Sequence, residues 1–275
     1  MERPGKVLWL FPRKQNPEKH IVLQSINVLE ENDFYNYLRE GLNQTDNKAA
    51  LIFVHGFNTS FDEAARRCGQ ICYDVPFSGI TGFFGWPSAG NNVFNYVRDV
   101  ERADASVSSL TAFIENIVDN TGVKKLHFIA HSMGNRILTR SLNQLIQKET
   151  FKNKINTIAQ IILAAPDIDT DVFNNEIYPS FRKIGKRRTI YASDEDMALF
   201  FSEKIRRGLK RLGEGGDNIY VVNGIDTIDA SNVMSKGMLR HSYVFETKDL
   251  LYDLNTLFTE GAAPEKRRLR KKLKK

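Results

Sequence analysis

The sequence is poor in cysteine and has no apolar segment long enough to cross a membrane. Its 275 residues include only two cysteines, which excludes a secreted framework built on several disulfides. No uninterrupted apolar run approaches the roughly 18 residues that a membrane span needs. The apolar run 7–11 is too short for the hydrophobic region of a secretory signal. These absences predict a cytoplasmic protein.

The two cysteines do not suggest a metal centre. Cys68 and Cys72 are four residues apart on an expected helix and so share one face of it. No further cysteine or histidine stands at a usual zinc-binding spacing from them. Two free thiols are expected, with no metal and no cofactor.

The net positive charge is concentrated at one end of the chain. Residues 265–275 contain eight basic residues and one acidic residue, a net charge of +7, whereas the whole chain carries +6. The body is therefore close to neutral. Residues 263–275 are expected to form a solvated, disordered basic tail. Leu269 and Leu273 would give that tail one thin apolar stripe if it became helical, so a weak contact with anionic membranes is considered.

Apolar strand-like runs alternate with helical patterns along the chain, which predicts a doubly wound, mostly parallel α/β sheet of about eight strands. Residues 1–262 are expected to form one domain, and the glycine-rich range 200–237 is considered as a cap over the site. The expected strands are 7–11, 21–28, 50–54, 80–86, 125–130, 158–165, 188–192 and 219–222. The expected helices are 31–41, 60–72, 93–120, 133–148, 195–211 and 246–259.

The strongest chemical signal is Ala130-His131-Ser132-Met133-Gly134, between an expected strand and an expected helix. A serine at such a tight turn projects its hydroxyl above the sheet, close to the first N–H groups of the helix. The usual pattern is Gly-x-Ser-x-Gly, and alanine at the first position is a departure that still permits close packing. Ser132 is the predicted nucleophile.

A serine hydroxyl needs a base to accept its proton, and the strand–turn–helix setting orders the triad as serine, acid, histidine. His241 is the only one of five histidines that follows Ser132, and it is the predicted base. His127 lies inside an expected strand and is interpreted as a packed residue. His131 should point to the opposite side of the turn.

The acid is expected after the strand 188–192, where Asp196 is the preferred candidate. Asp194 is a nearby alternative that also suits a helix N-cap. Asp167 and Asp169, which follow the preceding strand, are more distant alternatives.

A tetrahedral intermediate needs hydrogen-bond donors for its oxyanion. The backbone N–H of Met133 is one candidate, and the N–H of Phe57, which follows the His55-Gly56 dipeptide, is the other. His55 and Trp86 are candidates for the wall of the pocket. Alternatively, His55-Gly56 is only a turn, and Trp86 fills the core.

Four blocks resemble a bacterial, esterase- and lipase-like branch of the α/β-hydrolase superfamily whose substrates are largely unassigned. The regions 191–199 and 241–243 resemble its acid and histidine loops. The resemblance extends over roughly 50–258 and implies hydrolysis of an ester-like bond without a cofactor. The four blocks are 53–61, 85–88, 130–135 and 163–169.

A serine hydrolase acting on a small-molecule or lipid ester, or a thioester, is therefore the leading hypothesis. The alternative is a catalytically inactive protein of the same fold that acts as a binding or membrane-associated module through its basic tail. Nucleic-acid binding is disfavoured, because the basic tail lacks the stacking aromatic residues that usually accompany it.

Overall fold

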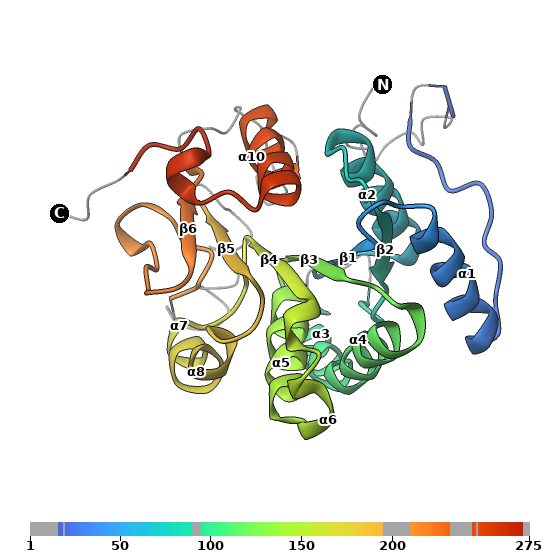
Figure 1. Ribbon diagram of the computed structural model, residues 1–275. Coiled ribbons are helices and arrows are strands. Elements are labelled where there is room, and N and C mark those ends of the chain that lie inside the picture. Colours follow the sequence, from blue (N-terminus) through green and yellow to red (C-terminus); the bar gives the residue numbers. More distant parts are fainter. Residues whose placement is uncertain are drawn as a thin grey trace.

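A computed structural model describes residues 16–18, 20–89, 95–194, 210–231, 244–245 and 247–271. Its centre is a parallel sheet of six strands in the order β2-β1-β3-β4-β5-β6 (Figure 1). The strands are β1 (Ala49–Val54), β2 (Ile80–Phe84), β3 (Lys125–His131), β4 (Ile158–Ala164), β5 (Arg187–Ala192) and β6 (Asp226–Asp229).

Helices cover both faces of this sheet (Figure 1). One face carries α1 (Glu31–Asn43), α3 (Tyr96–Ala105), α4 (Val107–Thr121), α5 (Gly134–Gln147), α6 (Glu149–Lys152) and α8 (Tyr178–Phe181). The opposite face carries α2 (Phe61–Asp74) and α10 (Lys248–Glu260). The short helices α7 (Thr170–Val172), η2 (Ile155–Thr157), η3 (Phe173–Ile177), η4 (Gly216–Asn218) and η7 (Pro264–Lys266) lie in the connections.

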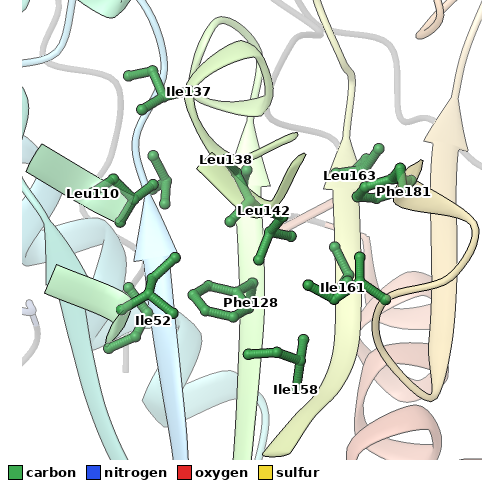
Figure 2. Close-up of a cluster of buried hydrophobic side chains, with 14 of the residues drawn as sticks. Ile52, Leu110, Phe128, Ile137, Leu138, Leu142, Ile158, Ile161, Leu163 and Phe181 are labelled. Atoms are coloured by element: carbon green, nitrogen blue, oxygen red, sulfur yellow. The ribbon is translucent and has the colours of Figure 1, made fainter. Parts of the chain in front are cut away.

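Alternate residues of each central strand pack into two separate cores. In β1, Ile52 belongs to the core beneath α4 and α5, whereas Leu51 and Phe53 belong to the core beneath α2 and α10. Figure 2 shows the first core, where Phe128 of β3 lies between the neighbouring strands and below Leu142 of α5. Burial on both faces explains why the central strands are nearly continuous apolar runs.

The predicted parallel α/β architecture is confirmed, but six strands are present among the described residues instead of eight. The range 21–28 has no strand structure and is largely exposed, so its apolar residues have no sheet to cover. The range 219–222 is also not a strand. Among the described residues, the last strand is β6, which pairs with β5 and belongs to the sheet although it lies within the expected cap range 200–237. The expected strand 7–11 and most of the expected helix 195–211 lie outside the described residues.

The single helix expected over 93–120 is divided at Ser106. The N–H of Ser106 donates to the carbonyls of Arg102 and Ala103, and its hydroxyl also donates to the Arg102 carbonyl. This local turn ends α3 and begins α4.

Of the two free cysteines, Cys68 is buried and Cys72 is exposed. Within the described residues, no helix is both long and apolar enough to cross a membrane.

The C-terminal segment differs from the expected solvated tail at Arg267, which is only 1 % exposed. Its guanidinium donates to both carboxylate oxygens of Asp253 in α10 and, over 3.2 Å, to the Tyr191 hydroxyl. Tyr191 donates in turn to Asp253 over 2.6 Å. Leu269 packs against the core beneath α10. The basic residue at 267 is therefore an internal partner of a buried carboxylate.

Candidate active site

The winding direction of the sheet changes between β1 and β3. The chain leaves β1 for α2 on one face and leaves β3 for α5 on the other, so the two connections diverge at the carboxyl ends of neighbouring strands. In open parallel sheets, ligands bind at such a switch point.

Ser132 lies at this point, in the turn between β3 and α5. Its φ of 51° is in the left-handed region that residues with a Cβ rarely adopt. The side chain is 5 % exposed. Such strain is characteristic of the nucleophile turn in α/β hydrolases. Met133 follows as the N-cap residue of α5, where backbone N–H groups have no partner within the helix.

Three hydrogen bonds hold the Ser132 carbonyl. The side-chain amide of Asn135 donates to it over 2.9 Å, and the Asn135 backbone N–H donates over 3.1 Å. The backbone N–H of Asp167 donates over 3.3 Å. The Asn135 amide also donates to the carbonyl of Ala164 over 3.1 Å and so ties the end of β4 to the turn. Sequence reasoning missed Asn135 because its position in α5 looks like any polar residue in the first turn of a helix.

The loop after β1 lies directly against this turn because two glycines allow it. A Cβ at Gly56 would be 2.9 Å from both the Cβ of Ser132 and the Nδ1 of His131. A Cβ at Gly134 would be 2.4 Å from the carbonyl oxygen of His55. Both distances are below the closest approach of real Cβ atoms. Any side chain at either position would therefore separate the two loops.

His55 is locked to Trp86 by two hydrogen bonds and by ring stacking. The backbone N–H of Trp86 donates to His55 Nε2 over 3.1 Å, and the indole N–H donates to the His55 carbonyl over 2.8 Å. The rings stack with centroids 5.2 Å apart. Because Nε2 accepts, Nδ1 carries the proton and donates it to the Gly56 carbonyl over 3.0 Å. Burial also lowers the pKa of His55, which favours this neutral form.

This neutral tautomer fixes the orientation of the next peptide unit. In a trans peptide the C=O and N–H point in opposite directions. Since the Gly56 carbonyl points at the His55 ring, the Phe57 N–H of the same peptide points away from it. Asn58 then reverses the chain with a φ of 55°. The candidate oxyanion donor at Phe57 therefore has a defined orientation set by a buried side chain.

The segment after β2 is held by α3. Asp99, which is fully buried, accepts hydrogen bonds from the Ser88 hydroxyl and the Ala89 N–H, each over 2.7 Å. Arg102 donates to the Pro87 carbonyl over 3.0 Å. The Ser88 hydroxyl also accepts from the N–H of Thr59, which links this segment to the loop after β1. Sequence reasoning did not identify Asp99, because it reads as one charge among several on α3.

The candidate acids differ in their surroundings. Asp167 is buried, with its carboxylate 2.6 Å from the donating Tyr96 hydroxyl and 3.3 Å from Arg211 Nε. Asp169 accepts N–H groups at the start of α7 as an N-cap. Asp194 is exposed, and its backbone N–H donates to Ser231.

Asp196 and His241 lie outside the described residues, so their roles stay predictions. The remaining histidines of the β3 region have other surroundings. His127 is buried between the rings of Phe77 and Phe258, and His131 contacts the ring of Phe245.

The electrostatics of the site favour an anion. The first turn of α5, described in full, contains no acidic residue that would offset the positive end of the helix dipole next to Met133. Within the described part of the chain, no group of three or more His, Cys, Asp or Glu side chains could hold a metal ion. The described geometry therefore places the N-terminus of α5 directly after a strained serine.

Solved structures that are similar to this chain include two hydrolase-like proteins. A predicted CIB-like hydrolase from Thermoplasma acidophilum has a TM-score of 0.42 and 14% identity, covering 75% of this chain and 84% of its own. A lipase-esterase related protein from Clostridium acetobutylicum ATCC 824 has a TM-score of 0.43 and 11% identity, covering 77% and 95%. The chain has no match among the curated proteins.

A family model gives the assignment. Residues 30–259 match the family described as "Alpha/beta hydrolase of unknown function (DUF900)". The match includes every strand of the sheet and the Ser132 turn. The protein therefore has the α/β-hydrolase fold and belongs to this family of α/β hydrolases of unknown function.

Proposed function

We propose that this protein is a serine hydrolase that cleaves carboxylic ester or thioester bonds through an acyl-enzyme intermediate on Ser132. The observation that carries the proposal is the strained φ of 51° at Ser132, between β3 and α5, with Gly56 packed against its Cβ. A strained residue at a switch point needs support from its surroundings, and such strain clusters at active sites.

In the proposed mechanism, His241 removes the proton of Ser132 while the hydroxyl oxygen attacks the substrate carbonyl. The backbone N–H groups of Phe57 and Met133 stabilise the oxyanion of the tetrahedral intermediate. His241 then donates the proton to the leaving alcohol or thiol. Water, activated by the same histidine, hydrolyses the acyl-enzyme. Asp196 orients the imidazole and stabilises its charged form.

The environment of the alternative acids supports Asp196. Asp169 serves as the N-cap of α7, and Asp194 is exposed to solvent. The Asp167 carboxylate already faces Tyr96 and Arg211. In the triad mechanism, amidating the acid lowers kcat by about 10⁴-fold. We therefore expect Asp196→Asn to approach this loss and His241→Ala to reach or exceed it, measured as kcat on a soluble ester.

The direct test is labelling by a fluorophosphonate probe, combined with a panel of p-nitrophenyl esters of graded acyl length. Ser132→Ala should abolish both labelling and turnover while the far-UV circular dichroism spectrum is unchanged. Ser60→Ala is the matched control, because Ser60 is an exposed serine that caps α2 near the same end of the sheet. Undiminished labelling of Ser132→Ala would overturn the assignment. A wild-type protein that neither hydrolyses the panel nor takes up the probe would favour the non-catalytic alternative.

A further inference from the structure

A buried cluster of three side chains, from three separate segments, lies next to the Ser132 turn. Tyr96 begins α3, Asp167 follows β4, and Arg211 precedes the segment that leads to β6. The Tyr96 hydroxyl donates to one carboxylate oxygen of Asp167 over 2.6 Å, and Arg211 Nε is 3.3 Å from the other. All three side chains are buried. We call this the Tyr96–Asp167–Arg211 cluster.

The cluster contacts both halves of the candidate site. Asp167 donates its backbone N–H to the Ser132 carbonyl over 3.3 Å. The Tyr96 ring packs edge-to-face on the Phe57 ring, with centroids 5.5 Å apart. Tyr96 therefore connects the residue that supplies a candidate oxyanion donor to the residue that holds the nucleophile turn. A shift of the Tyr96–Asp167 hydrogen bond would move the two loops relative to each other.

The backbone around Arg211 reinforces this connection. Leu212 donates its N–H to the Ile168 carbonyl over 2.9 Å, and Gly213 donates to the Pro166 carbonyl over 3.0 Å. These bonds clamp the stretch 166–168 on both sides of Asp167. The guanidinium is 1 % exposed, and within the described residues its Nε and Nη2 lack a hydrogen-bond partner. Among the described residues, Asp167 provides the carboxylate that pairs with this guanidinium.

Stability alone does not account for such a pair. Replacing a buried ion pair by apolar residues of similar volume is often neutral or stabilising, because desolvation offsets the attraction. The pair does fix geometry, since the guanidinium and the hydroxyl together restrain the Asp167 side chain from two directions.

We infer that the Tyr96–Asp167–Arg211 cluster is a positioning device that keeps the Ser132 turn and the Phe57 amide in register for catalysis. The inference rests on the proposed function. Its residues act through the backbone of the site and do not themselves contact the reacting atoms.

The test compares two Tyr→Phe variants that lose the same kind of bond. Tyr96→Phe removes a hydroxyl that donates to a buried carboxylate over 2.6 Å but keeps the ring that packs on Phe57. Tyr191→Phe removes a buried hydroxyl that also donates over 2.6 Å, to Asp253 on the other side of the sheet, and that accepts from Arg267 over 3.2 Å. Its loss of thermal stability should be at least as large as that of Tyr96→Phe. Only Tyr96→Phe should lower kcat, by about 10-fold or more, since a 1 Å misplacement can cost about 10²-fold.

Further readouts separate positioning from other roles. For Tyr96→Phe, KM should stay within about twofold and the pH dependence of kcat should keep its shape, because the base is unchanged. Arg211→Met should lower kcat in the same way, and Asp167→Asn in the Arg211→Met background should add little because the two side chains act as a unit. Arg211→Lys retains the charge and serves if Arg211→Met does not fold.

The inference is overturned if Tyr96→Phe leaves kcat within about twofold of the wild type, or if Tyr191→Phe lowers kcat as much. It is also overturned if Asp167→Asn costs about 10⁴-fold while Tyr96→Phe costs nothing, because Asp167 would then be the triad acid. Failure of the proposed function would be recognised separately, since the wild-type protein would then resist the fluorophosphonate probe.

Discussion

Arg267 should be essential for stability although it lies within a strongly basic segment. Replacing Arg267 by Met keeps an apolar stem of similar length and removes the charge that pairs with Asp253. Asp253 is 4% exposed, so it would remain as a buried carboxylate that, among the described residues, still accepts a hydrogen bond from the Tyr191 hydroxyl. Burial raises the pKa of Tyr191, which keeps that hydroxyl protonated, but one neutral donor does not replace a bidentate guanidinium.

The magnitude follows from the loss of one partner of a buried pair, which costs about 3–5 kcal/mol. For a domain of this size, about 1 kcal/mol lowers Tm by roughly 2–4 °C, so a decrease on the order of 10 °C is expected. Arg268→Met is the matched control. Arg268 is exposed, and its guanidinium lies 4.2 Å from the centroid of the Tyr252 ring, a contact that contributes about 0.5–1 kcal/mol.

Equilibrium unfolding in urea, followed by tryptophan fluorescence and circular dichroism, measures both free energies of unfolding. Asp253→Asn in the Arg267→Met background should recover part of the loss, because it removes the uncompensated charge. If Arg267→Met were no more destabilising than Arg268→Met, the buried pair would contribute nothing and the reasoning would be refuted. A chain ending at residue 264 should be destabilised at least as much as Arg267→Met. The burial of Arg267 corrects the expectation that the C-terminal segment is wholly solvated. The remaining basic residues stay candidates for a weak, salt-sensitive contact with anionic membranes.

Three further predictions concern His127, Gly56 and His55. Burial lowers the pKa of His127 to about 4 from 6.5, so its contribution to stability is present above about pH 6.5 and is lost as the pH falls towards 4. The free energy of unfolding should therefore fall with decreasing pH in this window by up to about 1.4 kcal/mol per pH unit, and His127→Leu should abolish this dependence in urea titrations. Gly56→Ala should lower kcat by roughly 10-fold or more because its Cβ would meet Ser132, whereas Gly82→Ala, whose Cβ would be 3.9 Å from its nearest neighbour, should leave kcat unchanged. His55→Ala frees the Gly56 carbonyl and should lower kcat towards the roughly 10²-fold loss of one oxyanion donor with little change in KM, and an unchanged kcat would contradict the proposed role of the Phe57 amide.

Local patterns predicted the centre of the fold because each central strand can be recognised from a short run of its own residues. The runs 50–54, 125–130 and 158–165 are apolar on both faces and end at turns, and all three are strands within one or two residues of their expected bounds. The same kind of pattern failed at 21–28, where apolar residues occur but most of the segment is exposed and unpaired. Strand pairing depends on a neighbour, which a local pattern does not contain.

The residues that support the site were missed for a related reason. Tyr96 and Asp167 are 71 positions apart, and Arg211 follows in a third segment, so no spacing in the sequence connects them. Arg267 pairs with Asp253 only because the segment after α10 folds back against that helix. A charged residue looks solvated unless its partner is known. The Ser132 turn, in contrast, is encoded by adjacent small residues, and its setting between a strand and a helix could be predicted.

The two glycines of the site connect these local signals to the long-range packing. A side chain at Gly134 would displace the His55 carbonyl, and this carbonyl accepts the indole N–H of Trp86. Displacing it would also disturb the backbone N–H of Trp86 that fixes the tautomer of His55. The turn that carries Ser132, the loop after β1 and the segment after β2 are therefore packed so that none can move without the other two. A substitution in any one of these three segments should displace the other two and so lower kcat. A substitution at the Tyr191–Asp253–Arg267 contact, on the other side of the sheet, should change stability alone.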